Sequence, residues 1–381
     1  MGRRGVGLLV GVVALSACQP YEGPCDVRDH RVALVKGFTP DLQVSGDGEV
    51  WATGWQVEDD EDASTQLTGV ARFTPDGQLL EAWTIPVPVL PTDVLGPTAS
   101  LEWAWSGDGI ATLRKINEVL PPDEAGEHLR SFLSFRAVAP DGTAGLPVEL
   151  TAASCVDCQL RWAMRALAGQ VAVVYQPRSL TTDVEAPLAE GLTHYLLLDA
   201  AGQVTTRGVL PLGPSDEDLG RFEVDARGLG FWLSTPDGQV HFDRDMQRVG
   251  GPYATDSAGP TPMDVDGEVV HAAWVDEADN VFQRSYEAGG PPLAPTERLS
   301  HGTAQAVRAS EQGLGVVLRD DGEAYFALSV NGEKVGGDTL LPDIIGGWPA
   351  VGALFVEGAA DFTLFMGDQN QVDRLELSCA P

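Results

Sequence analysis

The chain has 381 residues, of which 43% are hydrophobic, and it carries a formal net charge of −32 at pH 7. This hydrophobic content is enough for a packed core and argues against a wholly disordered chain. The negative field repels phosphate backbones and no cluster of Lys and Arg offsets it, so we expect no nucleic-acid partner. A chain of this length predicts either two domains or a repeat architecture.

The N-terminal stretch has the pattern of an export signal. Two arginines precede the apolar run Val6–Leu15, which is too short to span a bilayer. The run ends in Leu15-Ser16-Ala17-Cys18, which resembles the lipobox of bacterial lipoproteins. The resemblance implies that residues 1–17 are a signal peptide and that the Cys18 thiol carries diacylglycerol. An ordinary secretory signal that is cut nearby is the alternative.

The residue after the lipobox cysteine bears on location. In lipoproteins of this kind an Asp at that place often marks retention in the inner membrane, and here the residue is Gln19. The resemblance therefore favours the outer membrane. We expect residues 18–30 to be a lipidated tether and residues 31–381 to form the folded domain. No later apolar run is long enough to span a bilayer, so the lipid would be the only anchor.

Two kinds of turn recur along the rest of the chain. The sequence TPDGQ occurs at Thr74–Gln78 and at Thr235–Gln239, and a near copy lies at Ala139–Thr143. Each lies between strand-like runs, which is a hairpin signal. We interpret this turn as structural, the tight connection between the outer strands of successive blades. A second, glycine-centred turn precedes an apolar strand seven times, at Gly48, Gly109, Gly169, Gly228, Gly267, Gly313 and Gly358.

The spacing of these turns divides the chain into seven units of four short strands. This pattern predicts an all-β fold, a β-propeller of seven four-stranded blades. The last unit has only three strands, and Arg31–Val35 is an orphan strand ahead of the first unit. We predict that this N-terminal strand completes the last blade and closes the ring. Six or eight blades are the alternatives.

Three polar or proline-rich insertions interrupt the early units. We predict that they are exposed loops on one rim, and only short fragments such as Pro122–Arg130 have helical character. The insertions are Val57–Gln66, Glu118–Glu127 and Pro177–Gly191.

Four cysteines remain after Cys18, two near the ends of the mature chain and two close together. Their positions favour the disulfides Cys25–Cys379 and Cys155–Cys158 over the other two pairings. Redox and zinc roles are the alternatives for the Cys155-Val-Asp-Cys158 motif. Strand-like residues follow this motif and a second cysteine pair is missing, so we favour a structural disulfide at the turn between two blades.

Propeller geometry places a ligand site at the mouth of the central channel, where the first strand of each blade ends. The candidate polar residues on these strands are Gln43, Glu102, Arg161, Glu223, Asp264 and Arg308. Such a mixture of acids and arginines across facing blades could bind a polar ligand. Ordinary strand polarity is the alternative.

The sequence contains no recognised catalytic or metal-binding motif, so we assign no catalytic residue, metal ligand or cofactor. Loose Ca²⁺ sites at the acidic stretches Glu58–Asp62 and Asp276–Asn280 are the alternative. We expect His271, Trp232 and Trp274, which lie on second strands, to pack within and between blades rather than to bind a ligand.

Together these features predict a non-enzymatic, lipid-anchored propeller of the cell envelope that binds or scaffolds a protein or glycan partner. The rival hypothesis is a hydrolase or lyase acting on glycans through carboxylates at the channel mouth, because propellers host both kinds of function. A third hypothesis is an assembly factor for outer-membrane proteins.

Overall fold

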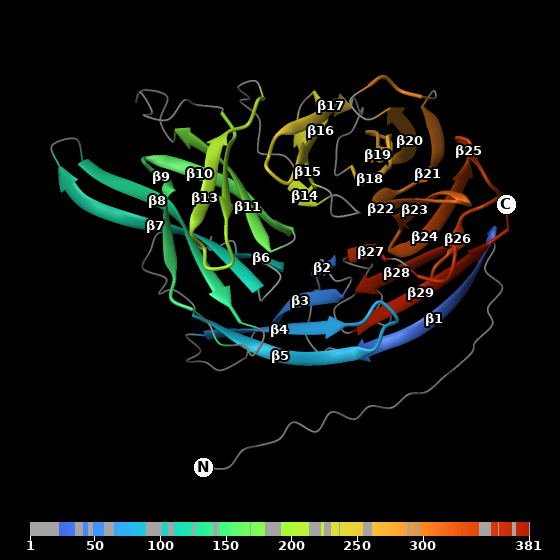
Figure 1. The fold of residues 1–381 in the computed structure, drawn as a ribbon, viewed down its shortest axis with the longest axis horizontal. Coiled ribbons are helices and arrows are strands. Elements are labelled where there is room, and N and C mark those ends of the chain that lie inside the picture. The colour runs from blue at the N-terminus through green and yellow to red at the C-terminus, as the bar shows by residue number, and fades with distance from the viewer. Residues whose placement is uncertain are drawn as a thin grey trace, which may run out of the picture.

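The computed structural model (Figure 1) shows a ring of seven antiparallel sheets. It describes residues 23–34, 41–44, 49–56, 65–88, 101–105, 110–123, 126–139, 143, 145–167, 169–179, 192–212, 222–224, 230–235, 237–253, 261–287, 290–293, 296–342, 352–356, 358–367 and 371–380. Within these residues every regular element is a strand. The predicted β-propeller of seven four-stranded blades is therefore confirmed.

The strands follow one another in chain order within each blade. The first blade contains β2 (Asp41–Val44), β3 (Val50–Gln56), β4 (Thr65–Phe73) and β5 (Leu79–Pro88), and the second contains β6 (Leu101–Trp105), β7 (Ile110–Asp123), β8 (Gly126–Val138) and β9 (Val148–Val156). The third contains β10 (Cys158–Leu167), β11 (Gln170–Ser179), β12 (His194–Leu198) and β13 (Val204–Val209), and the fourth contains β14 (Phe222–Val224), β15 (Gly230–Thr235), β16 (Gly238–Asp243) and β17 (Arg248–Tyr253).

The remaining blades differ only in their outer strands. The fifth contains β18 (Met263–Asp266), β19 (Val269–Val275), β20 (Asn280–Glu287) and β21 (Glu297–His301). The sixth contains β22 (Thr303–Ser310), β23 (Gly313–Asp320), β24 (Glu323–Val330), β25 (Glu333–Lys334) and β26 (Thr339–Leu340), the last two both pairing with β24. The seventh contains β27 (Gly352–Val356), β28 (Phe362–Gly367), β29 (Gln371–Cys379) and β1 (Cys25–Leu34).

The N-terminal strand closes the ring as predicted. β1 pairs antiparallel with β29, from Cys25 opposite Cys379 to Leu34 opposite Gln371. A disulfide joins Cys25 to Cys379, whose Cα atoms lie 4.0 Å apart although 354 residues separate them in sequence. The strand begins at Cys25 rather than at the predicted Arg31, so the second half of the expected tether belongs to the sheet.

All seven glycine turns fall between the first and second strands of a blade. Three of these glycines have a positive φ, namely Gly169 at 81°, Gly267 at 61° and Gly313 at 132°. Glycine adopts such angles without the steric penalty that a Cβ brings, which explains the recurrence. Gly48, Gly109 and Gly228 lie outside the described residues, although the strands on either side of them are described.

The prediction that TPDGQ joins successive blades is wrong, because each copy joins two strands of one blade. Thr74–Gln78 connects β4 to β5, and Thr235–Gln239 spans the β15–β16 turn. The near copy lies in sequence between β8 and β9, where the Ala139 amide donates to the Thr143 carbonyl at 2.9 Å. A tight turn reverses the chain onto its antiparallel neighbour, so its natural place is inside a sheet.

The Thr74–Gln78 turn is one case of a turn that other sequences also form. The Thr74 amide donates to the Gln78 carbonyl at 2.9 Å, and the Thr74 hydroxyl accepts the Gln78 amide at 3.0 Å. In three other turns an aspartate takes the place of Thr74. Its Oδ1 accepts the backbone amides two and four residues further on, at Asp199, Asp243 and Asp276. The fourth residue of these turns has a positive φ, of 86° at Gly77, 80° at Gly202, 60° at Met246 and 56° at Asp279.

The insertion predicted as a loop at Glu118–Glu127 is instead the end of a long hairpin. β7 and β8 pair from Ile110 opposite Val138 to Asp123 opposite Gly126. The helical character predicted for Pro122–Arg130 is therefore wrong, because cross-strand pairing overrides it. The hairpin leaves the ring on the left of Figure 1. Residues 57–64 and 180–191 of the other insertions lie outside the described residues.

The core lies between the faces of neighbouring blades. Phe326 of the sixth blade and Phe362 of the seventh have ring centroids 5.0 Å apart. Trp232 and Trp274 are buried in one cluster that spans the fourth and fifth blades. The predicted packing role of these two tryptophans is confirmed.

Candidate functional site

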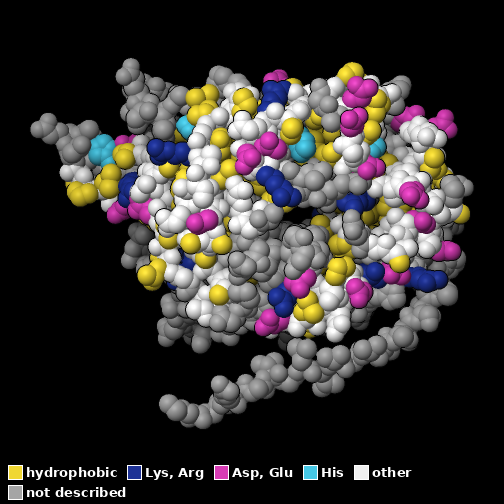
Figure 2. All heavy atoms as spheres, in the orientation of Figure 1, with side chains coloured by type: hydrophobic (Ala, Val, Ile, Leu, Met, Phe, Trp, Pro, Cys, Tyr) yellow, Lys and Arg dark blue, Asp and Glu magenta, His cyan; other side chains and the backbone are white. Residues whose placement is uncertain are grey.

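The first strands of the blades surround the centre of the ring, where β2, β14, β18, β22 and β27 lie nearest one another (Figure 1). Figure 2 shows a hollow near this centre, with Lys or Arg side chains beside it. The candidate residues all lie on first strands, Gln43 on β2, Glu102 on β6, Arg161 on β10, Glu223 on β14, Asp264 on β18 and Arg308 on β22. The side chains of Gln43 and Glu102 lie outside the described part of the structure.

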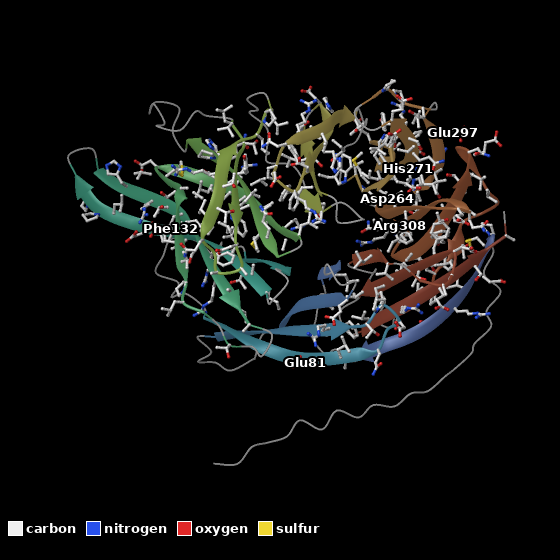
Figure 3. The ribbon with its side chains drawn as sticks, viewed as in Figure 1. Glu81, Phe132, Asp264, His271, Glu297 and Arg308 are labelled. Carbon is white, nitrogen blue, oxygen red and sulfur yellow. A yellow bond between two sulfur atoms is a disulfide. The ribbon has the colours of Figure 1, made fainter. Side chains whose placement is uncertain are left out.

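Figure 3 shows that the candidate residues it labels lie closer to the centre of the ring than the labelled charged residues of the outer strands. Asp264 and Arg308 lie on neighbouring first strands near the centre of the ring, whereas Glu81 and Glu297 lie on the fourth strands of their blades. The sequence therefore placed its candidates on the correct strands. Their contacts decide what each can do.

Asp264 is fully buried and contacts the neighbouring blade. Its side chain is 0% exposed, and its Oδ2 accepts the backbone amide of Ala309 at 2.8 Å. Ala309 follows Arg308 on β22, so the carboxylate connects the fifth blade to the sixth. A carboxylate held in this way stabilises the ring and offers little to a ligand from solvent.

Glu223 makes the equivalent connection between the third and fourth blades. Its two carboxylate oxygens accept Nε and Nη2 of Arg165 on β10, each at 2.9 Å. Two parallel charge-assisted hydrogen bonds of this kind fix both side chains. Sequence reasoning missed Arg165, although it lies four residues after Arg161 and so points to the same face of β10.

Arg161 and Arg308 are half-buried on their first strands, and each interacts with other groups of the protein. They are the two described candidates that carry positive charge towards the centre of an otherwise acidic molecule. Of the candidate acids, Glu223 and Asp264 are thus both engaged by groups of an adjacent blade.

Two histidines of the fourth and fifth blades are packed within the sheets, and a packing role was predicted for one of them, His271. His271 lies opposite Asp264 across the β18–β19 pair, and its Nδ1 is 2.8 Å from the Ser285 hydroxyl. His241 stacks on Trp232 with ring centroids 4.2 Å apart. Burial lowers the pKa of His241 to about 4, against the opposing field of Asp243. Its imidazole is therefore neutral at physiological pH.

The Cys155-Val-Asp-Cys158 motif lies at the predicted junction between two blades. A disulfide joins Cys155 at the end of β9 to Cys158 at the start of β10. Between them Asp157 has a φ of 52°, and its Oδ1 accepts the Leu129 amide at 2.9 Å. The other oxygen of Asp157 binds Nδ1 of His128. The motif thus holds the β7–β8 hairpin near its tip, at the point where the second blade passes into the third.

The acidic stretch Asp276–Asn280 uses its own oxygens. Oδ1 of Asp276 accepts the Ala278 and Asn280 amides and the Asn280 side chain, and these bonds lower the pKa of Asp276. Across the described residues no group of three or more His, Cys, Asp or Glu side chains is suited to hold a metal ion. Glu58–Asp62 lies outside them. The part of the chain that is described also has no helix long and apolar enough to cross a membrane.

The β7–β8 hairpin is a second candidate surface, which the sequence did not identify. β6 pairs with β7 only as far as Arg114, and β9 pairs with β8 only from Arg130 onward. Beyond the Glu118–Arg130 pair the hairpin is therefore a two-stranded ribbon. Val119 on it is 45% exposed. Cζ of Arg130 lies 4.8 Å from the ring centroid of Phe132, the residue that Figure 3 labels on this hairpin. Nη1 of Arg130 also lies 3.4 Å from Oε2 of Glu118 on the facing strand. These contacts brace the ribbon where it begins.

Comparison with known proteins identifies no family. No family model matches the chain, and no curated protein matches its sequence. Among solved structures, a chain of the mitotic checkpoint complex matches with a TM-score of 0.49 and 10% identity, over 100% of this chain and 99% of that chain.

Two solved enzymes also match. A mutant of the Synechocystis apocarotenoid oxygenase has a TM-score of 0.42 and 12% identity, over 69% of this chain and 62% of that chain. Trypanosoma rangeli sialidase has a TM-score of 0.36 and 10% identity, over 90% of this chain and 55% of that chain. Such low values concern the fold alone, so the assignment of the propeller rests on its strand topology.

Proposed function

We propose that the protein is an exported, lipid-anchored β-propeller that binds a protein or glycan partner without catalysing a reaction. The Leu15–Cys18 motif supports lipidation at Cys18, and Gln19 supports the outer membrane as the destination. The two disulfides support export, because such bonds persist in oxidising compartments.

The observation that carries the binding role is the β7–β8 ribbon. It extends beyond the strands on both of its sides, and it is braced where it begins by Arg130 and by the Asp157 turn. An isolated two-stranded ribbon is only marginally stable in water, so these braces favour a fixed shape. A rigid projection with an exposed apolar side chain such as Val119 is suited to meet a partner.

The contacts of the first-strand carboxylates favour binding over the enzyme hypothesis. A general acid or base must reach the substrate directly or through one water. Asp264 is buried against Ala309, and Glu223 is engaged by Arg165. The glycan-cleaving alternative would therefore have to use other groups, of which Glu102 is the remaining carboxylate among the sequence candidates.

Affinity capture after mild cross-linking in the native cell envelope tests the proposal. The bait is the full-length protein, compared with Cys18→Ala and with a variant in which Val119–Leu129 is replaced by Asn-Gly. That replacement keeps the Glu118–Arg130 pair beside the new turn. Leu146→Ser is the matched control, because it removes an apolar side chain that is 86% exposed at the other end of the same blade.

We expect one partner that is retained by the Leu146→Ser protein and lost from the shortened hairpin. Loss of that partner from Cys18→Ala would show that it is met at the membrane. A partner that is itself an outer-membrane protein under assembly would favour the assembly-factor hypothesis. Equal capture by the shortened hairpin would contradict the binding role of the ribbon, and release of reducing ends from envelope glycans would favour the enzyme.

A further inference from the structure

The residues just before β1 are fixed to two blades. A Cβ on Gly23 would lie 2.6 Å from the Cα of Thr339, so the chain there runs directly against β26 of the sixth blade. The Pro24 carbonyl accepts the Ala380 amide at 3.0 Å, which ties the same segment to the end of the seventh blade. The path of the chain is therefore set two residues before the closing strand begins.

Covalent and polar contacts hold the next residue as firmly. Cys25 is bonded to Cys379, and the Cys379 amide donates to Oδ2 of Asp361 at 2.7 Å. Asp361 lies in the turn between β27 and β28, so three segments of the seventh blade meet at this point. The first residue pair of the β1–β29 ladder is thus cross-linked, which attaches the chain after Gly23 covalently to the last strand of the ring.

Only four residues, Gln19 to Glu22, separate Cys18 from this fixed point. At about 3.4 Å per fully extended residue, Gly23 can lie no more than roughly 17 Å from the Cys18 backbone. A diacylglycerol on Cys18 places that backbone at the lipid headgroups. The rim of the ring near Gly23 must then stay within the same short distance of the membrane.

We propose that the outer rim of the sixth and seventh blades, around Gly23 and Glu333, faces the lipid headgroups. This inference rests on the lipidation in the proposed function and adds an orientation to it. Glu333 is exposed at the start of β25, and Gly336 in the same outer segment lies beside Pro24. The net charge of −32 does not draw the protein to anionic lipid, so the tether length imposes the orientation.

The orientation also determines which surface of the propeller remains accessible to a partner. In Figure 1 the start of β1, beside the C-terminus, lies across the ring from the β7–β8 hairpin. With the rim of the sixth and seventh blades at the membrane, the hairpin is directed away from this attachment. A partner that binds the hairpin then has no need to pass between the propeller and the bilayer.

Photo-cross-linking to lipid tests the orientation. The lipidated protein is purified with Glu333→benzoylphenylalanine and, as the control, Val119→benzoylphenylalanine, and each is reconstituted into vesicles of phosphatidylethanolamine and phosphatidylglycerol. We expect several-fold more lipid adduct at position 333 than at position 119. A flexible Gly-Ser insert of about 20 residues between Glu22 and Gly23 raises the average span of the tether to roughly 27 Å and should reduce the adduct at 333.

Two results would overturn the orientation: equal adducts at both positions, or an adduct at 333 that the insert leaves unchanged. The mass of the N-terminal peptide is measured in the same samples. Diacylglycerol present with no preference for 333 overturns the orientation alone. Diacylglycerol absent from Cys18 overturns the proposed anchor, and this inference with it.

Discussion

At the scale of single residues, the same five letters form two different turns. In Thr74–Gln78 the Thr74 and Gln78 main chains bond to each other, and Gly77 has a φ of 86°. In Thr235–Gln239 the residue paired with Thr235 is Gly238, so the turn is shorter. The letters predict a reversal of the chain in both places. Which register the reversal takes depends on the strands on either side, and these cannot be read from five residues.

The positive φ at the fourth turn position gives a stability prediction. Asp279 is exposed and has a φ of 56°, an angle that costs an ordinary residue more than glycine. We expect Asp279→Gly to raise the free energy of unfolding by about 0.5 kcal/mol in chemical denaturation, because relief of the left-handed strain exceeds the added freedom of glycine in the unfolded chain. The matched control is Gly322→Ala, which places a Cβ in open space at a φ of 89° and should lower stability. A loss of stability in Asp279→Gly would contradict this account.

His241 predicts a pH dependence of stability. Burial lowers its pKa from 6.5 to about 4 in the folded protein, so the unfolded chain binds the proton more readily. The stabilising contribution is therefore complete above pH 6.5 and is lost as the pH falls from 6.5 towards 4, by roughly 3 kcal/mol. His241→Phe keeps an aromatic ring over Trp232 and should flatten that part of the stability curve. An unchanged slope between pH 6.5 and 4 would contradict the assignment.

At the scale of elements, the sequence located the first strands but not what their side chains bind. The alternation of polar and apolar residues is a local pattern, so it placed Glu223 and Asp264 on the correct strands. Their partners Arg165 and Ala309 lie 58 and 45 residues away, on adjacent blades. Such contacts arise when the ring assembles, and no local signal encodes them.

The buried carboxylate of Asp264 should matter more for folding than for ligand binding. Asp264→Ala leaves the Ala309 amide without its acceptor in the interior, which should cost roughly 2–3 kcal/mol in the free energy of unfolding. Glu268→Ala, at an exposed position in the next turn, is the control and should change stability by less than about 0.5 kcal/mol. Equal stability of the two variants would show that Asp264 does not join the blades.

The β7–β8 hairpin shows how composition misled the prediction. Pro121, Pro122 and the acidic residues around them are typical of loops. The structure continues the strands through this region, with Ile116 opposite Phe132 and Val119 opposite Leu129. Cross-strand apolar pairs and the Glu118–Arg130 ion pair favour the ribbon over a loop.

At the scale of the whole molecule, the rhythm of turns was enough to predict the ring. The seven glycine turns predicted the number of blades. The orphan N-terminal strand and the nearby Cys25 predicted how the ring closes. These features were readable because each of them either repeats along the chain or lies in the strands that close the ring. The start of the closing strand was misplaced, because Cys25 and Val27 are followed by a run of charged or titratable residues, Arg28–Arg31, that is not typical of a strand.

Closure by a disulfide predicts a large stability difference between the two cysteine pairs. In the chain-entropy model a cross-link over 354 residues contributes more than about 5 kcal/mol, and one over a few residues about 2 kcal/mol. Cys25→Ser with Cys379→Ser should therefore lower the denaturation midpoint much more than Cys155→Ser with Cys158→Ser. The reverse order would contradict ring closure as the main role of the first disulfide.

The central claim is that a lipid-anchored chain closes its own ring through its N-terminal strand. The most direct test is peptide mapping by mass spectrometry, without reduction, of the protein taken from its native membrane. The account predicts a cross-linked peptide containing Cys25 and Cys379 and an N-terminal peptide that begins at Cys18 and carries diacylglycerol. Cys25 joined to Cys155 or Cys158, or an unmodified Cys18, would contradict it.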